Sequence, residues 1–162
     1  MSEPDYALED AALVQRCRVS AGPSGGPGGQ HANRNATAVR VVHPSGVTAE
    51  CGGMRERGAN RSRALRRLRL RLACAQRGQA QRRWLDERRQ GKRLPVTPKA
   101  QGYHLVVAVA LDALAQAEGR LGPAAAGLDL STSQLTRLLV ADKEVRQAAD
   151  ALRAQHGHGP LR

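Results

Sequence analysis

Aromatic residues are almost missing from this 162-residue chain. It has no phenylalanine, and its only aromatic side chains are Tyr6, Trp84 and Tyr103. A hydrophobic core must therefore be built from leucine, valine and alanine. Proteins that hold single-stranded nucleic acids stack successive bases on exposed aromatic rings. Three aromatics in the whole chain exclude such stacking as the main way of binding a nucleic acid.

Cysteine is also scarce, and no metal site is expected. Cys17, Cys51 and Cys74 lie far apart and form no C-x-x-C pair, so they read as reduced intracellular thiols. No cysteine or carboxylate lies at ligand spacing from His156 and His158, which favours a mobile tail over a zinc site. No motif calls for a cofactor.

Targeting and membrane segments are missing as well. The first 15 residues contain four acidic residues and no lysine or arginine, unlike a secretory or mitochondrial leader. No apolar run reaches the length needed to span a bilayer. The sequence therefore predicts a cytoplasmic protein without a membrane partner.

Positive charge is abundant and concentrated. The formal net charge is +12, and residues 55–93 hold 15 of the 26 basic residues but only 3 acidic ones. The rest of the chain is balanced. Most of the surplus is arginine, whose guanidinium group binds phosphate in a bidentate fashion. This bias favours a polyanionic partner bound through phosphate contacts and counterion release.

Local patterns in the first half predict a small sheet and a basic helix. We expect a short helix over residues 5–13 and a strand over 14–20. Two further strands, at 37–42 and 47–51, should form a hairpin around the turn His43-Pro44-Ser45-Gly46. A long basic helix is expected over residues 60–89. Asn60 would cap it, and Leu65, Leu68 and Leu72 would form its buried stripe.

The second half reads as a neutral helical lobe. Helices are expected over residues 105–117 and 123–128, then over 132–140 with Ser131 as its cap, and from Asp142 to about His156. The resulting prediction is an α+β protein with residues 1–90 as one domain, 91–102 as a linker and 103–162 as the lobe.

Part of this lobe has the residue spacing of some helix-turn-helix motifs. Ala124-Ala125, Leu128-Asp129-Leu130 and Gln134-Leu135 fall at the matching positions. Residues 100–162, however, contain six basic and six acidic residues. This balance favours a packed lobe without nucleic-acid contacts.

A glycine-rich stretch lies between the first two expected strands, Ala21 to Gln30. A nucleotide P-loop would need a Lys-Ser or Lys-Thr pair after the glycines, and a dinucleotide fingerprint would need a strand–turn–helix unit. Neither is present. The tripeptide Gly28-Gly29-Gln30 is instead followed, in order, by His31, Asn33, A-V-R at 38–40, H-P-S-G-V at 43–47, Glu50-Cys51 and the arginine-rich segment.

This order resembles the catalytic domain of the class I peptide-chain release factors over roughly residues 8–75. The chain departs from the family pattern in three places. Pro23 stands where an arginine is usual, Arg55-Glu56-Arg57 replaces the first three residues of the family's R-S-Q-x-x-N, and Arg34 replaces a lysine. The resemblance implies that Gly28, Gly29 and Gln30 are the catalytic residues. Together with the positive charge of the basic segment, the resemblance also implies a set of RNA-binding residues. They are His31, Asn33, Arg34, Arg40, Arg55, Arg57, Arg61, Arg63, Arg66, Arg67, Arg69 and Arg71.

The same resemblance implies an enzyme that hydrolyses the ester of peptidyl-tRNA in the peptidyl transferase centre. Its partners would be the large-subunit rRNA of the ribosome and peptidyl-tRNA, and it would act as a monomer. Nothing in the 162 residues resembles a stop-codon-reading domain, which favours codon-independent release on stalled ribosomes. The alternative is a non-catalytic ribosome-binding factor that retains the glycine-glycine-glutamine loop.

Overall fold

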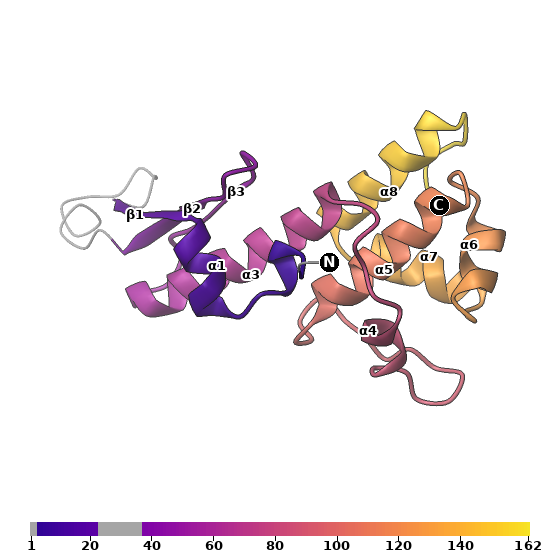
Figure 1. Ribbon diagram of the computed structural model, residues 1–162, viewed down its shortest axis with the longest axis horizontal. Helices are drawn as coiled ribbons and strands as arrows, with labels where there is room; N and C mark the ends of the chain where they lie inside the picture. The colour runs from indigo at the N-terminus through magenta and orange to yellow at the C-terminus, as the bar shows by residue number, and fades with distance from the viewer. Residues whose placement is uncertain (1–2, 23–36) are drawn as a thin grey trace. The chain divides into compact units, whose positions relative to one another are not determined.

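The computed structural model describes residues 3–22 and 37–162 and contains two compact units, Asp5–Leu72 and Ala73–Arg162, the latter together with the residues up to Pro4. Figure 1 shows the elements of both. Strands and helices occupy separate stretches, so the predicted α+β class is confirmed. The predicted division into 1–90, a linker at 91–102 and 103–162 stays a prediction, because compactness does not define which segments fold independently.

The first unit is a three-stranded antiparallel sheet with short N-terminal helices and one long helix. The strands β1 (Arg18–Gly22), β2 (Ala38–Val42) and β3 (Thr48–Cys51) pair in sequence order. The β2–β3 hairpin confirms the prediction. Its turn places Gly46 at φ 87°, a conformation that glycine adopts without a steric penalty.

The N-terminal elements differ from the expectation. Residues 5–13 are not one helix: a 3₁₀ turn, η1 (Asp5–Ala7), is followed by α1 (Asp10–Arg16). The strand predicted over 14–20 was wrong in position, because α1 continues to Arg16 and β1 begins at Arg18. Residues 14–20 therefore span the end of a helix and the start of a strand. Val19, on β1, is 38% exposed.

Alternation of buried and exposed residues builds the core of this unit. Val39, Val41 and Ala49 are buried, whereas Arg40 and Glu50 are exposed on the opposite face. On α3 (Arg57–Ala75) the predicted stripe of Leu65, Leu68 and Leu72 is buried. Burying this row of leucines together with the valines of the sheet supplies the main hydrophobic contribution.

The basic helix is shorter than predicted. α3 ends at Ala75 instead of continuing to residue 89, and the next helix, α4 (Arg83–Asp86), is a single turn. Gly78, at φ 78°, lies between them. The arginine-rich composition continues past Ala75, but the run of buried leucines spaced for a helix ends at Leu72. The helix stops where its apolar face stops.

The second unit is helical and is built around α5 (Tyr103–Gln116). α5 contacts α4, α6 (Leu121–Gly127), α7 (Thr132–Val140) and α8 (Lys143–Gln155). Its residues from Val106 to Leu111 are all buried. Ser131 caps α7 with a full capping box and Asp142 caps α8, both as predicted. Glu118 and Gly119 take positive φ after α5 and end it.

The C-terminal residues pack against the unit, which corrects the predicted mobile tail. Leu161 is 2% exposed, and its backbone N–H donates to Asp150 Oδ1 at 2.7 Å. The Arg153 guanidinium donates to the Gly159 carbonyl at 2.8 Å. His158 Nε2 lies 3.0 Å from the Glu118 carbonyl. These contacts use the histidine and arginine side chains for packing.

Candidate functional site

The predicted catalytic tripeptide lies on the connection between β1 and β2. Gly28, Gly29, Gln30, His31, Asn33 and Arg34 all fall outside the described residues. The ends of this connection are described: Gly22 pairs with Ala38, and Ala21 with Val39, in an antiparallel register. Paired residues of antiparallel strands have Cα atoms about 5 Å apart. The sheet therefore holds both ends of the connection side by side.

Asn60 fixes the end of the connection that enters β2. This side chain is 0% exposed, and its amide donates to the carbonyls of Thr37 at 2.8 Å and Met54 at 2.9 Å. Its Oδ1 accepts from the Met54 backbone N–H at 2.9 Å. One buried amide thus joins the start of β2, the segment after β3 and the first turns of α3.

Sequence reasoning missed this role of Asn60. We expected an N-terminal cap, but Asn60 lies inside α3, three residues after Arg57. The predicted cap was wrong because the helix begins earlier. The signal that could have found the role is the position of Asn60 in the family pattern R-S-Q-x-x-N, where it is the final residue.

The β2–β3 turn is fastened by a second buried polar group. His43 is 5% exposed, and its Nε2 lies 2.8 Å from Asp5 Oδ2 while its Nδ1 lies 2.7 Å from Ser45 Oγ. Nδ1 also accepts from the Ser45 backbone N–H at 3.1 Å, so the ring proton is on Nε2 and is donated to Asp5. Asp5 additionally pairs with Arg16. These contacts tie the turn to η1 and α1.

The predicted RNA-binding arginines fall into two groups. Arg69 and Arg71 are partly buried and bonded within the unit: Arg69 pairs with Asp10 and donates to the Leu8 carbonyl, and Arg71 donates to the Thr48 carbonyl at 2.6 Å. The others in the described region have exposed side chains that a polyanion could reach. They are Arg40, Arg55, Arg57, Arg61, Arg63, Arg66 and Arg67.

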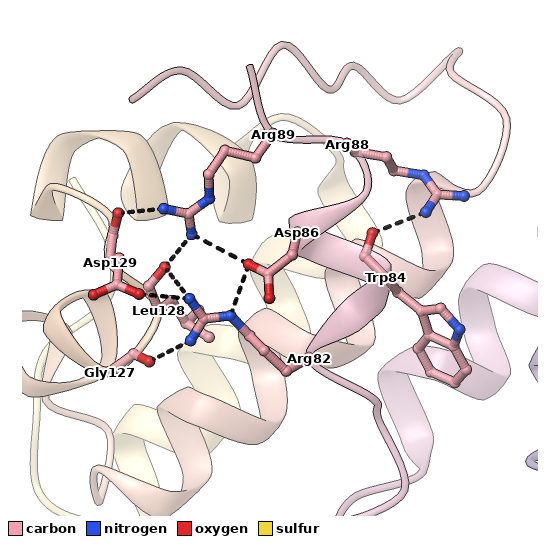
Figure 2. A network of polar contacts seen from close by, with 8 residues as sticks. All are labelled: Arg82, Trp84, Asp86, Arg88, Arg89, Gly127, Leu128 and Asp129. Carbon is pink, nitrogen blue, oxygen red and sulfur yellow. Dashed lines mark hydrogen bonds and ion pairs between the residues drawn. The ribbon is translucent and has the colours of Figure 1, made fainter. Parts of the chain in front are cut away.

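The basic residues after α3 belong to the second unit, and several of them are bonded within it. Arg77 pairs with Asp112 at 3.3 Å. Figure 2 shows Arg82 and Arg89 directed at the residues that follow α6, and Arg88 donating to the Trp84 carbonyl. The basic residues over 55–93 were predicted to bind one polyanion together. They are instead of two kinds: some form hydrogen bonds or ion pairs within the protein, and others have exposed side chains.

Residues 3–22 and 37–162 contain no group of three or more histidine, cysteine or acidic side chains arranged to hold an ion. The three cysteines form no disulfide. Burial raises the pKa of Cys74 to about 12, with further raising by Glu144 and Asp142 and an opposing effect of Arg77. No helix in these same stretches is both long and apolar enough to cross a membrane.

Comparison with known proteins identifies the family. Residues 13–101, more than half of the chain, match the RF-1 domain. The chain is 44% identical over 73 residues to peptide chain release factor 1 of Verminephrobacter eiseniae and 40% identical over 73 residues to that of Delftia acidovorans. It is 50% identical over 50 residues to peptide chain release factor 1 of Caldicellulosiruptor bescii.

These matches cover a small part of the relatives. The first two alignments each span 44% of this chain and 20% of the relative, and the third spans 30% and 14%. No solved structure matches the chain. Residues 13–101, which match the family model, contain the three strands, the connection with the glycine-glycine-glutamine tripeptide, and α3. The chain therefore belongs to the RF-1 domain family, the release-factor family that its motifs resemble.

Proposed function

We propose that this protein hydrolyses the ester bond of peptidyl-tRNA in the large ribosomal subunit and releases the nascent peptide without reading a codon. The observation that carries the proposal is the tripeptide Gly28-Gly29-Gln30 on the connection between two paired strands of an RF-1 domain. The related proteins named above are peptide chain release factors, and that name describes release of a peptide chain.

The chemistry requires little from side chains. Water attacks the ester carbonyl, and a backbone N–H directed at the developing oxyanion or the leaving 3′ oxygen lowers the barrier. In this proposal the N–H of Gln30 is that donor, and its side chain positions water. Glycine at 28 and 29 lets the backbone approach the tRNA end, because no Cβ stands in the way.

The contacts around Asn60 support this mechanism. A donor that acts through backbone geometry must be carried on a fixed base. Asn60 holds Thr37 and Met54 from a fully buried position, and strand pairing holds Gly22 beside Ala38. We propose that Asn60 is a positioning residue for the tripeptide.

Binding to the ribosome would depend on the exposed arginines of the first unit. Arg61, Arg63, Arg66 and Arg67 are exposed on α3, and Arg55 and Arg57 are exposed at and just before its start. Guanidinium groups so arranged suit the phosphates of rRNA. His31, Asn33, Arg34 and Arg40 would add contacts next to the tripeptide, and the partners would be large-subunit rRNA and peptidyl-tRNA.

Release of labelled formyl-methionine from ribosomes that carry it on tRNA tests the proposal directly. Gly29→Ala should lower release at least about 100-fold while ribosome binding stays close to normal, because a Cβ disfavours positive φ and crowds the ester. Gln30→Ala keeps the N–H and should be milder, with hydroxylamine now competing against water.

The alternative function is a ribosome-binding factor that does no chemistry. In that case Gly29→Ala would change neither release nor binding, and wild-type protein would release nothing above background. Intact Gly28, Gly29 and Gln30 favour the hydrolase, since a pure binding protein has no use for this tripeptide.

Codon independence needs its own comparison. The assay is run on ribosomes programmed with a stop codon, with a sense codon or with no mRNA beyond the P site. Peptide release from the three should proceed at similar rates, or fastest when the A site is empty. A preference for the stop codon of more than about tenfold, equivalent to 1.4 kcal/mol, would contradict the codon-independent part of the proposal and leave the hydrolase part standing.

A further inference from the structure

The second unit carries more positive charge than the predicted lobe. Residues 100–162 are balanced, with six basic and six acidic residues, but the compact unit begins at Ala73. Over residues 73–162 there are 14 basic and 8 acidic residues, a net charge of +6. The equal numbers of basic and acidic residues over 100–162, which argued against nucleic-acid contacts, therefore do not hold for the whole compact unit.

The spacing that resembles a helix-turn-helix motif falls on two helices joined by a turn. α6 ends at Gly127 and α7 begins at Thr132, and the two helices contact each other. Asp129 stands at the position of the turn glycine and takes φ 51°, the left-handed conformation that such a turn requires. Leu128 and Leu130 on either side are buried.

Two arginines clamp this turn to the segment that precedes α5. Arg82 donates to the Gly127 carbonyl at 2.7 Å and to Asp129 Oδ2 at 2.7 Å, and Arg89 donates to the Asp129 carbonyl at 3.0 Å. Asp86 lies between the two guanidinium groups, 3.0 Å from Arg82 Nε. Figure 2 shows both arginines converging on the turn from one side.

The clamp continues into a basic turn beside α7. Gln90 and Arg93 exchange two backbone hydrogen bonds of 2.9 Å, which closes a tight turn with Gly91 at φ 57°. The Gln134 side chain on α7 donates to the Lys92 carbonyl at 2.7 Å. Lys92 and Arg93 are exposed. Lys92 and Arg93 are thereby placed next to α7.

The exposed side of α7 also carries positive charge. Ser133 and Arg137 are exposed, and the helix contains no acidic residue. Lys92, Arg93, Ser133 and Arg137 together are called the α7–turn surface. Its chemistry is guanidinium, ammonium and hydroxyl groups, which bind phosphates and sugar hydroxyls.

Stacking of bases on aromatic rings is excluded for this surface. Tyr6, Trp84 and Tyr103 are the only aromatic residues of the chain, and all are at most 4% exposed. The groups that this surface offers instead suit the backbone of double-helical RNA, whose deep, narrow major groove leaves phosphates and 2′-hydroxyl groups as the accessible contacts.

We propose that the α7–turn surface binds the sugar-phosphate backbone of double-helical RNA. The choice of RNA over DNA rests on the proposed function, which places the protein on the ribosome. Arg82 and Arg89 are positioning residues in this proposal, since they hold the basic turn and the α6–α7 turn together without facing the RNA.

Binding of the full chain to a fluorescently labelled 20-base-pair RNA duplex, followed by anisotropy, tests the surface. All variants carry Arg61→Gln and Arg63→Gln to weaken binding through α3. The test variant adds Lys92→Gln, Arg93→Gln and Arg137→Gln. The control variant adds Lys99→Gln, Arg120→Gln and Arg162→Gln, which remove the same charge from other exposed positions.

The test variant should bind the duplex about tenfold or more weakly than the control, and its log–log salt slope should be smaller by about 2 to 3. Unchanged Trp84 fluorescence on heating would show that folding is intact. If the test and control variants bound the duplex with equal affinity, the proposal that the α7–turn surface binds RNA would be wrong. Binding DNA of the same sequence as tightly as RNA would overturn the choice of partner. Neither outcome depends on release activity, which Gly29→Ala tests separately.

Discussion

Asn60 joins separate segments of the first unit through one buried side chain. It is fully buried and satisfies three backbone groups of two segments. Asn60→Asp keeps the shape and one acceptor but loses both donors, leaving a carboxylate against the Thr37 and Met54 carbonyls. We expect a loss of about 3 kcal/mol in unfolding free energy, measured by urea titration.

In this variant the rate of peptide release should also fall, even at temperatures where the protein stays folded, because the end of the connection that contains Gly28-Gly29-Gln30 is no longer fixed. The matched control is Ser62→Ala, two residues along α3, whose exposed hydroxyl bonds the Gly58 carbonyl at 3.2 Å. Its stability should change by less than about 0.5 kcal/mol. Equal stability of Asn60→Asp and Ser62→Ala would contradict the positioning role.

Cys74 gives a chemical readout of packing in the second unit. Burial is the main reason that its pKa rises from 9.0 to about 12. The thiolate is the reactive form, so at pH 8 native protein should react with iodoacetamide at Cys74 about 1,000-fold more slowly than urea-unfolded protein. Between pH 8 and 10 the native rate should still increase with pH. Mass spectrometry of the labelled peptide measures both, and equal rates in the two states would refute the burial.

At the scale of elements, α3 has two kinds of arginine, and they predict different phenotypes. Arg61 and Arg63 are exposed, whereas Arg69 and Arg71 bond the N-terminal segment and β3. Arg61→Gln with Arg63→Gln should weaken ribosome binding, reduce its salt slope by about 2 and leave thermal stability unchanged.

Arg69→Gln with Arg71→Gln removes the same charge and should instead lower unfolding free energy by about 2 kcal/mol, because carbonyls at Leu8 and Thr48 lose their donors. Sedimentation with ribosomes and thermal melting, run on both double variants, separate the two effects. If both pairs change the salt slope alone, the internal bonds of Arg69 and Arg71 contribute nothing to folding.

The cap of α7 offers a second test at this scale. Ser131 accepts from the Gln134 N–H at 3.2 Å, and the Gln134 side chain accepts from the Ser131 N–H at 2.9 Å. Ser131→Ala should destabilise the second unit by about 1 kcal/mol, as read from the melting of Trp84 fluorescence. Thr132→Ala, one residue later and exposed, is the control. Identical melting of the two variants would contradict the capping box.

Patterns within one element were readable from the sequence, and boundaries that depend on other elements were not. The β2–β3 hairpin and the caps Ser131 and Asp142 follow from neighbouring residues, since alternation, a turn glycine and a capping side chain are local signals. The end of α3 was missed because arginines 77 to 89 continue a helix-compatible composition. The side chains of Arg77, Arg82 and Arg89 bond α5 and the turn after α6 instead.

At the scale of the whole molecule, each unit has a core of its own. Trp84 and Leu85 on α4 are buried in the second unit, where α4 contacts α5. A chain ended after Lys99 keeps these side chains but loses α5. We therefore expect it to aggregate and to show red-shifted Trp84 emission, whereas a chain ended after Ala75 should stay dispersed and keep the β-sheet signal in circular dichroism.

Native-like Trp84 emission in the chain ended at Lys99 would show that residues 76–99 belong with the first unit. The full-length protein under the same conditions is the control for both truncations, and light scattering reports aggregation independently of fluorescence.

The sequence by itself determined the family, the α+β class and the charged composition, because these depend on residue identity and on order along the chain. Tertiary structure decided which arginines bond the protein and which face solvent, and it gave Asn60 a central place. Charge is a property of each residue, but exposure and hydrogen bonding depend on which distant segments fold beside it. For this reason Arg61 and Arg69, alike in the sequence, differ in what they can contact.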